Sequence, residues 1–369
     1  MHNHDTLGYV SLYTPRDSGA GCLMNIKAVA QRANVSTATV SRTINGSGKV
    51  NPRTAERVLK AIKAVNFYPD TNARALGSGR SGLFGLIISD ITNPFFPELV
   101  KAFEDIAVLH EKEVLIANTN YDPARMEICV TRMLQRKVDG VAIMTSEMDN
   151  RLIEVFSRRH IPLVFLDTGT LGPGVSCTKI DYSAGIDLAM AHLIGLGHHR
   201  IAFISGPLRL ASARMRHRAF IESSTREHLD RNESLIQEGN HRVDGGHEAM
   251  KRILKSGVRP TAVMASNDLT AIGAMGAISE AGLRVPDDIS VIGFDDIQLS
   301  AFTMPPLTTV SLPRAEIANT AFRALLNANP ANSSKPVQGE EHTIQPTFVL
   351  RKSTAPAFDR LSPSDKQAR

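Results

Sequence analysis

The sequence predicts a small all-α head at the N-terminus, followed by a larger α/β body built on parallel sheets. Three observations indicate this division. Residues 24–80 carry ten Lys or Arg side chains against only Glu56 and Asp70, a net charge of +8 in a chain whose total is +5. Apolar residues recur at helical spacing up to Val65. From Leu83 onward, short apolar runs alternate with helical stretches, which is typical of α/β domains.

The bulk composition is that of a soluble globular protein, with 42% hydrophobic and 21% charged residues. No apolar run reaches the roughly 18 residues needed to span a bilayer. Residues 1–23 lack the long apolar stretch and cleavage site of a secretory signal. We therefore expect a cytoplasmic protein in which residues 1–23 form a disordered extension.

The cysteines and histidines do not indicate a metal site. Cys22, Cys129 and Cys177 are odd in number and far apart, so neither a disulfide framework nor a zinc spacing follows. None of the twelve histidines lies in an HExxH context or beside a paired cysteine. We expect no metal and no cofactor.

The first two predicted helices form a helix-turn-helix. Ser36 is a good N-cap for a helix over residues 37–44, because its hydroxyl can accept a backbone N–H of the next turn. The connection between the helices is so short that they must meet at a steep angle. Asn34 lies where this turn needs a positive φ, which asparagine tolerates well. The apolar stripe of the first helix consists of Ile26, Val29, Ala30 and Ala33.

A third helix completes the predicted head. Asn51 caps it, and Pro52 occupies the first position, where its missing N–H costs nothing. Its apolar stripe is expected to close a three-helix core and consists of Val58, Leu59, Ile62 and Val65. The basic charge of this head favours a polyanion-binding module; a generic helical bundle with a solvated charged face is the alternative.

The polar face of the second helix suits DNA. Arg42 can reach guanine O6 and N7 bidentately, and Ala38 can contact a thymine methyl in the major groove. Hydroxyl and amide side chains of the same segment can bind phosphate, which positions the protein without reading sequence. These predicted phosphate ligands are Ser36, Thr39, Ser41 and Asn45.

Three stretches of the head carry a family resemblance. The segments IKAVAQRANVSTATVSRTIN (26–45), NPRT (51–54) and NFYPDTNARAL (66–76) closely resemble the lactose/galactose repressor (LacI/GalR) family, and the resemblance continues to about residue 352. It implies that Thr37, Ala38 and Arg42 read bases in the major groove.

The same resemblance implies a hinge helix after the head. In this family the segment from about Asp70 to Leu76 would be helical on operator DNA. Leu76 would wedge between base pairs from the minor groove, with Ala73 beside it, which kinks the duplex. Asp70 departs from the asparagine that the family often has. The family also implies a homodimer on a near-palindromic operator.

Two glycine-rich stretches imitate nucleotide-binding loops. GSGRSG (77–82) fits the dinucleotide fingerprint, which requires a strand before the glycines and a helix after them. Here a hinge precedes and a strand follows, so residues 70–82 are better interpreted as hinge helix and linker. NGSGKV (45–50) lacks the upstream Gly and the final Ser/Thr of a phosphate loop. With no nucleophile–base pair or metal set either, we expect no enzyme activity.

Eight apolar runs in the body predict strands that are covered on both faces, hence a parallel sheet. They are LFGLIISDI, EVLIANTN, DGVAIMTS, PLVFLD, CTKIDY, RIAFISG, TAVMASND and ISVIGFDD. Polar residues gather at their carboxyl ends, where open α/β sheets bind ligands: Asp90, Asn118, Asp167, Asp181, Asn267, Asp268 and Asp295. Each one alone could equally be a helix cap, and only their repetition favours a cleft.

The family resemblance implies a two-lobed body similar to periplasmic sugar-binding proteins, with an effector in the cleft. Position by position, it implies effector contacts from Phe95, Phe96, Asp167, Ser212, Arg216, Asn267 and Asp295. Arg and carboxylates together suit polyhydroxylated ligands through charge-assisted bonds. His241 lies where some members carry an aromatic platform, and Thr168 lies where ribose binders often have Arg.

The expected organisation combines these parts. The DNA-binding domain spans 24–69, and the effector-binding and dimerisation domain spans 83–352. Its N-lobe covers about 83–198 and 311–340, its C-lobe about 199–310 and 341–352, and residues 353–369 form a disordered tail. We expect a transcriptional repressor whose operator affinity is controlled by a sugar or related metabolite. The alternative is a solute-binding protein of the periplasmic sugar-binding type, which would need a signal peptide and no basic head.

Overall fold

The computed structural model describes residues 25–68 except 45, 47 and 49, and residues 80–357 except 146–147, 168, 230–231 and 329–337. The chain divides into two compact units, Met1–Gly79 and Arg80–Arg369. The predicted extension at 1–23, the hinge positions Ala73 and Leu76, and Asn45 lie outside the described residues.

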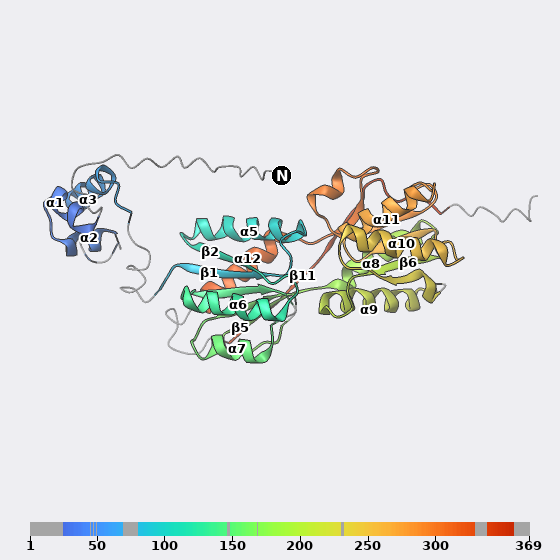
Figure 1. The fold of residues 1–369 in the computed structure, drawn as a ribbon, viewed down its shortest axis with the longest axis horizontal. Helices are drawn as coiled ribbons and strands as arrows, with labels where there is room; N and C mark the ends of the chain where they lie inside the picture. The colour runs from blue at the N-terminus through green and yellow to red at the C-terminus, as the bar shows by residue number, and fades with distance from the viewer. Residues whose placement is uncertain are drawn as a thin grey trace, which may run out of the picture. The chain divides into compact units, whose positions relative to one another are not determined.

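The head is a three-helix unit, as predicted. It consists of α1 (Ile26–Ala33), α2 (Thr37–Ile44) and α3 (Pro52–Ala64), which pack on one another (Figure 1). Its core contains the buried side chains of Val29, Ala30, Ala33, Val40, Val58 and Ala61. Small residues on α1 allow this close packing.

The predicted turn and caps of the head are confirmed. Asn34 adopts a left-handed conformation with φ of 51°. The Oγ of Ser36 accepts a hydrogen bond from the backbone N–H of Thr39 at 3.1 Å. The side chain of Asn51 accepts one from the N–H of Arg53 at 3.0 Å. These three helix ends therefore have the local conformation or partner that the sequence indicates.

The prediction that Leu59 belongs to the apolar stripe of α3 is wrong. Leu59 is 52% exposed, whereas Val58 is fully buried and Ile62 and Val65 pack partly buried against the core. Since each residue rotates the helix by 100°, Leu59 lies beside the stripe that Val58, Ile62 and Val65 share.

The body contains two six-stranded sheets with corresponding strand orders. The first has the order β11-β5-β4-β3-β1-β2, and the second has the order β12-β10-β9-β8-β6-β7. Every pairing is parallel except that of β12 with β10. The strands are β1 (Leu83–Ile88), β2 (Glu113–Asn118), β3 (Gly140–Met144), β4 (Leu163–Leu166), β5 (Val175–Ile180), β6 (Ile201–Ser205), β7 (Ile236–Glu238), β8 (Ala262–Ala265), β9 (Ser290–Asp295), β10 (Thr308–Ser311), β11 (Glu341–Ile344) and β12 (Thr347–Val349).

All eight predicted strands are present, and β7, β10, β11 and β12 were not predicted. β1 begins directly after Gly82, which confirms that a strand follows the GSGRSG stretch. The expectation of cover on both faces is wrong for β2, an edge strand in which Ile116 is 42% exposed.

Helices cover both faces of each sheet (Figure 1). In the first lobe α5 (Phe95–Leu109) and α12 (Arg314–Asn327) contribute to one core cluster, while α6 (Pro123–Gln135) and α7 (Asn150–Ser157) contribute to another. In the second lobe the corresponding pairs are α8 (Tyr182–Gly195) with α9 (Ala211–Arg226), and α10 (Val243–Lys255) with α11 (Asp268–Glu280). Two short 3₁₀ helices, η1 (Glu233–Leu235) and η2 (Gln298–Ala301), complete the second lobe. Among the described helices, none is both long and apolar enough to cross a membrane.

The chain crosses between the lobes three times, and two predicted lobe boundaries need correction. α8 packs against α9, β10 and β12 of the second lobe, so the first crossing lies near Asp181 rather than at about residue 198. β11 pairs with β5, so residues 341–344 belong to the first lobe rather than the second. The other crossings join β10 to α12 and β11 to β12.

The predicted disordered tail at 353–369 is wrong for its first residues. The Oγ of Ser353, fully buried, donates to the carbonyl of Val291 at 2.6 Å and accepts from the N–H of Thr308 at 2.8 Å. The N–H of Ala355 donates to Ser290 Oγ at 3.0 Å. Residues 358–369 lie outside the described part of the chain.

Candidate functional site

The outer face of α2 carries the residues predicted to read bases. Thr37, Ala38 and Arg42 are exposed, whereas Val40 points into the head core. A rotation of 100° per residue places Ala38 and Arg42 on the side of α2 away from Val40, while Thr37 is exposed at the first position of the helix. The helix therefore presents two short side chains and one long guanidinium to solvent.

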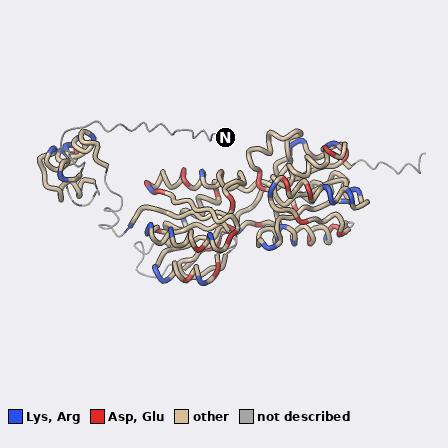
Figure 2. The backbone as a smooth tube through the Cα atoms, viewed as in Figure 1, with Lys and Arg blue, Asp and Glu red and all other residues tan. Residues whose placement is uncertain are grey.

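The head is strongly basic. Residues 25–68 include eight Lys or Arg residues and a single acid, Glu56, which forms an ion pair with Lys60 at 2.8 Å. The tube in Figure 2 shows positive positions on all three head helices. This excess of positive charge suits a polyanion such as duplex DNA.

Two of the predicted phosphate ligands also cap α2. Ser36 Oγ lies 3.0 Å from Thr39 Oγ1 and accepts the N–H of Thr39. The hydroxyl of Thr43 donates to the carbonyl of Thr39 at 2.9 Å. The start of α2 is thus fixed by its own side chains, and the phosphate role of Ser36, Thr39 and Ser41 stays a prediction.

The structure brings all seven predicted effector residues to one cavity between the two lobes. The cavity encloses about 550 Å³ of empty space when the solvent at its open mouth is included. Its lining consists of Ser89, Asn93, Phe95, Phe96, Tyr121, Met144, Thr145, Leu166, Asp167, Tyr182, Leu210, Ser212, Arg216, His241, Asn267 and Asp295.

Two aromatic rings form one wall. Phe95 and Phe96 begin α5, and their ring centroids lie 5.5 Å apart at an interplanar angle of 82°. The side chain of Asn93 accepts the N–H of Phe95 at 3.1 Å and fixes the start of the helix. This wall offers apolar ring surface to a ligand.

Arg216 is the buried cation of the cavity. Its guanidinium carbon lies 4.6 Å from the ring centroid of Tyr182 and 4.5 Å from that of Phe294. One Nη donates to the carbonyl of Ser266, and the other lies 3.4 Å from Asp295 Oδ1. Its Nε is buried without a hydrogen-bond partner in the described structure. The two rings are neighbours, with centroids 5.8 Å apart, and both contact the guanidinium.

Asp167 and Asp295 are the buried anions. Both have positive φ, 95° and 106°, a costly backbone conformation for residues other than glycine. Burial raises the pKa of each carboxyl to about 6, although the charge of Arg216 opposes the rise. The Oδ1 atom of Asp167 is buried without a partner among the described residues. Strain and shifted pKa values in one cavity indicate a functional site.

Asn267 lines the cavity, but both ends of its amide are engaged elsewhere. Its Oδ1 accepts the N–H of Thr270 at 3.0 Å, which caps α11, and its Nδ2 donates to the carbonyl of His241 at 3.0 Å. The helix-cap alternative for this residue is therefore realised in the structure.

Tyr182 and His241 line the cavity and were not among the predicted effector residues. Tyr182 directly follows Asp181 after β5, so it lies at the same sheet edge as the predicted residues. His241 follows β7, a strand of three residues whose periodicity gives no signal. Burial lowers the pKa of His241 to about 3, so its imidazole is neutral. A Cβ on Gly206 would lie 1.9 Å from His241 Nε2, so this glycine makes room for the ring.

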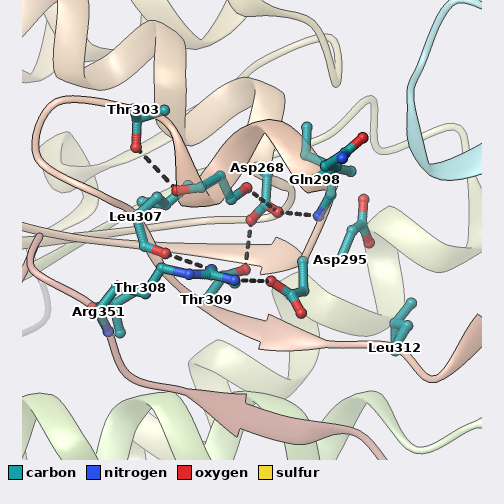
Figure 3. Close-up of polar contacts among 12 residues, drawn as sticks. Asp268, Asp295, Gln298, Thr303, Leu307, Thr308, Thr309, Leu312 and Arg351 are labelled. Carbon is teal, nitrogen blue, oxygen red and sulfur yellow. Dashed lines mark hydrogen bonds and ion pairs between the residues drawn. The ribbon is translucent and has the colours of Figure 1, made fainter.

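Asp268 is not a cavity residue but anchors the loop behind it (Figure 3). Its carboxylate accepts hydrogen bonds from the N–H of Ile297 at 2.8 Å, from Ser300 Oγ at 2.6 Å and from Thr309 Oγ1 at 2.5 Å. Burial, together with the charge of Asp295, raises the pKa of Asp268 to about 7. The network holds the segment that follows Asp295.

Two more of the predicted strand-end residues, Asp181 and Asn118, serve the fold. Asp181 caps α8 by accepting the N–H of Ala184 at 2.9 Å, and Asn118 accepts the N–H of Ile91 at 3.0 Å. Within the described ranges, no group of three or more His, Cys, Asp or Glu side chains could hold a metal ion.

Comparison with known proteins gives consistent matches to both units. Residues 25–70 match the family model described as bacterial regulatory proteins, lacI family, and residues 190–354 match the periplasmic binding protein-like domain. The HTH-type transcriptional repressor PurR of Mannheimia succiniciproducens is 35% identical over 334 residues, which cover 90% of this chain and 98% of that protein.

Two solved structures extend the likeness. The Lac repressor dimer bound to operator and the anti-inducer ONPF matches with a TM-score of 0.77 and 30% identity, covering 89% of this chain and 98% of that one. The complex of the transcriptional regulator CelR with cellobiose matches with a TM-score of 0.67 and 26% identity, covering 89% of this chain and 99% of that one.

Proposed function

This chain belongs to the LacI family of bacterial regulatory proteins, and from that premise we infer that it represses transcription by binding operator DNA under the control of a small-molecule effector. The observation that carries the inference is the pairing of a basic helix-turn-helix head with a two-lobed body that encloses a charged cavity.

For the head, we propose that Thr37, Ala38 and Arg42 read base edges in the major groove. The exposure of all three side chains on α2 supports this role. Arg42 would bond to guanine, while Ser36, Thr39, Ser41 and Asn45 would bond to phosphates. Ala73 and Leu76 would act in the minor groove, in the segment outside the described residues.

For the cavity, we propose a sugar-like effector. Phe95 and Phe96 would contact its apolar faces, and Asp167, Arg216 and Asp295 would bond its hydroxyls, with Ser212 and Asn267 nearby. The unpartnered Oδ1 of Asp167 and Nε of Arg216 support this assignment, because buried polar atoms normally have partners. The solved complex of the similar regulator CelR with cellobiose supports the proposal of a sugar-like ligand.

For the assembly, we propose a homodimer on a near-palindromic operator, as in the Lac repressor dimer bound to operator. Effector binding would change the angle between lobes and hence the spacing of the two hinge segments. A coupling of ~1–3 kcal/mol is typical of such linkage and changes DNA affinity several-fold to ~100-fold.

Two other classes are less well supported. A solute-binding protein without DNA function would lack the head, yet residues 25–70 match the lacI family model. An enzyme is disfavoured because the similar proteins are repressors.

A panel of pentoses, hexoses and disaccharides, tested by thermal shift on the full chain, identifies the effector class. We expect one or a few members to raise Tm in the parent and not in Asp167→Asn. Asp187→Asn removes a carboxylate on α8 that pairs with Arg226 outside the cavity, so it should retain the shift. An equal shift in Asp167→Asn and the parent would remove Asp167 from the effector site.

A further inference from the structure

We propose that Arg242 and Asp90 form a latch that joins the two lobes beside the cavity and sets how firmly the site retains its effector. This inference rests on the effector role proposed above for the cavity. It concerns residues that bind each other rather than the ligand, since neither of them lines the cavity.

The latch is an ion pair between lobes. Arg242 Nη2 lies 2.9 Å from Asp90 Oδ2. Asp90 follows β1 of the first lobe, whereas Arg242 stands directly before α10 of the second lobe. The Asp90 side chain is only 5% exposed and the Arg242 side chain is 51% exposed. The nearly buried carboxylate of Asp90 thus forms an ion pair with a cation of the opposite lobe.

Hydrogen bonds from Thr92 orient the Asp90 carboxylate so that its second oxygen faces Arg242. Its Oδ1 accepts the N–H of Thr92 at 3.0 Å and the hydroxyl of Thr92 at 2.6 Å, which leaves Oδ2 for Arg242. Burial disfavours the ionised form, but the bonds from Thr92 and Arg242 outweigh it, so the pKa of Asp90 is lowered. Separating the lobes would expose the pair to water and remove this favourable contact.

The ion pair lies far from the crossings, where lobe movement is largest. All three crossings leave from strands β5, β10 and β11, which lie at or next to one edge of the two sheets. Asp90 follows β1 and Arg242 follows β7, at the other side of both strand orders. A rotation of the lobes about the crossings separates the edges far from the crossings most. A contact at those far edges therefore opposes opening more effectively than a contact near the crossings.

A second contact at the same edge supports the latch. The guanidinium of Arg209, after β6, lies 5.7 Å from the ring centroid of Tyr121, after β2. Ser89 and His241, the chain neighbours of the latch residues, line the cavity, as does Tyr121. Opening at this edge therefore opens the cavity itself.

The contacts between lobes on the side of the crossings should change less when the lobes rotate. Glu98 of α5 pairs with Arg314 at 2.8 Å and accepts the N–H of Gln298 at 3.0 Å. Arg314 begins α12 directly after a crossing, so this group lies close to the rotation axis and moves little.

Because the proposed effector touches both lobes, it binds the closed form better, and its apparent affinity scales with the fraction of closed protein. Because Asp90 is nearly buried and Arg242 is half exposed, their ion pair should shift the ratio of open to closed protein by about threefold to tenfold.

The test measures the distance between lobes and needs no ligand. Nitroxide labels are placed on the full chain through Gln135→Cys in α6 and Lys255→Cys in α10, both exposed, with Cys22→Ser; Cys129 and Cys177 are buried. Double electron–electron resonance then compares the labelled parent with Asp90→Asn, with Arg242→Gln and with the double variant. Lys251→Gln is the matched control, since it removes a positive charge from α10 that pairs with Glu248 within the same helix.

We expect Asp90→Asn and Arg242→Gln each to add a population at longer distance, the double variant to add no more than either single one, and Lys251→Gln to match the parent. Arg242→Gln, at a half-exposed position, decides the test if Asp90→Asn fails to fold. Distances in Arg242→Gln that equal those of the parent would overturn the latch. If the distances respond but no sugar shifts Tm, the sugar proposal fails and the latch stands.

Discussion

Asp167 and Asp295 illustrate how much of the cavity's chemistry is decided by single residues. Each combines a positive φ with burial, and each has a pKa raised to about 6. Arg216 pairs with the carboxylate of Asp295 and itself contacts two neighbouring rings. Buried polar atoms without partners are costly, so a ligand that bonds to them gains affinity and specificity.

The raised pKa values predict that effector affinity depends on pH. A carboxylate that accepts ligand hydroxyls does so best when ionised, so affinity should fall as the pH falls through about 6, where Asp167 and Asp295 become protonated. Losing one charge-assisted bond should weaken binding about tenfold or more. Isothermal titration with the sugar found by thermal shift, between pH 5 and 8, checks this. A flat profile would show that neither carboxylate bonds to the ligand as an anion.

The same two carboxyl groups make folding stability depend on pH in the opposite direction to effector affinity. Their folded pKa values lie above those of exposed aspartates, so between pH 4 and 6 the folded state holds protons that the unfolded chain has lost. Their contribution therefore lowers the free energy of unfolding as the pH rises through this range. Urea unfolding of Asp167→Asn should show a weaker decrease than the parent.

Asp268 offers a test of charge against hydrogen bonding. An amide in its place can keep all three bonds, because its oxygen can face the donors of Ile297 and Ser300 while its NH₂ donates to the Thr309 hydroxyl. Asp268→Asn should therefore change stability little, whereas Asp268→Ala should cost about 3 kcal/mol by leaving donors unpaired. Urea unfolding at pH 8 distinguishes the two; an equal loss in both variants would show that the charge itself is required.

At the scale of elements, the sequence predicted what depends on local pattern. The caps at Ser36 and Asn51, the left-handed Asn34 and the eight strands with apolar runs follow from short-range rules and were all confirmed. β7 was missed because three residues carry no period, and β11 because three of its four residues are polar and exposed and form no apolar run. The cavity residues at strand ends were predictable; the placement of Tyr182 and His241 depends on how the lobes pack.

The N-cap of α2 should be measurable. Ser36→Ala removes the acceptor for the N–H of Thr39 and should destabilise the helix by about 1 kcal/mol. Hydrogen exchange of the α2 amides in the full chain should then be several-fold faster than in the parent. Thr37→Ala, at an exposed position beside it, is the control and should leave exchange nearly unchanged.

The exposed face of α2 predicts a specificity phenotype. Arg42→Ala should abolish preference for a selected operator over unrelated duplex and leave weak, salt-sensitive binding through the remaining cations. Fluorescence anisotropy at two salt concentrations measures both quantities. Arg57→Ala, at an exposed position on α3, serves as the matched control and should retain the preference. Unchanged preference in Arg42→Ala would exclude base reading by this side chain.

At the scale of the whole molecule, the three crossings determine how the two lobes can move relative to each other. They join two sheets of corresponding strand order, so the lobes can rotate about one side while the cavity opens on the other. The lobe boundaries could not be located from sequence, because only packing assigns α8 and β11 to a lobe.

The most direct test selects duplexes from a randomised DNA pool with the full chain and, in parallel, with residues 80–369 alone. We predict that the full chain enriches a sequence with approximate two-fold symmetry and that the body alone enriches none. Enrichment of the same sequence by the body, or of no sequence by the full chain, would contradict the account.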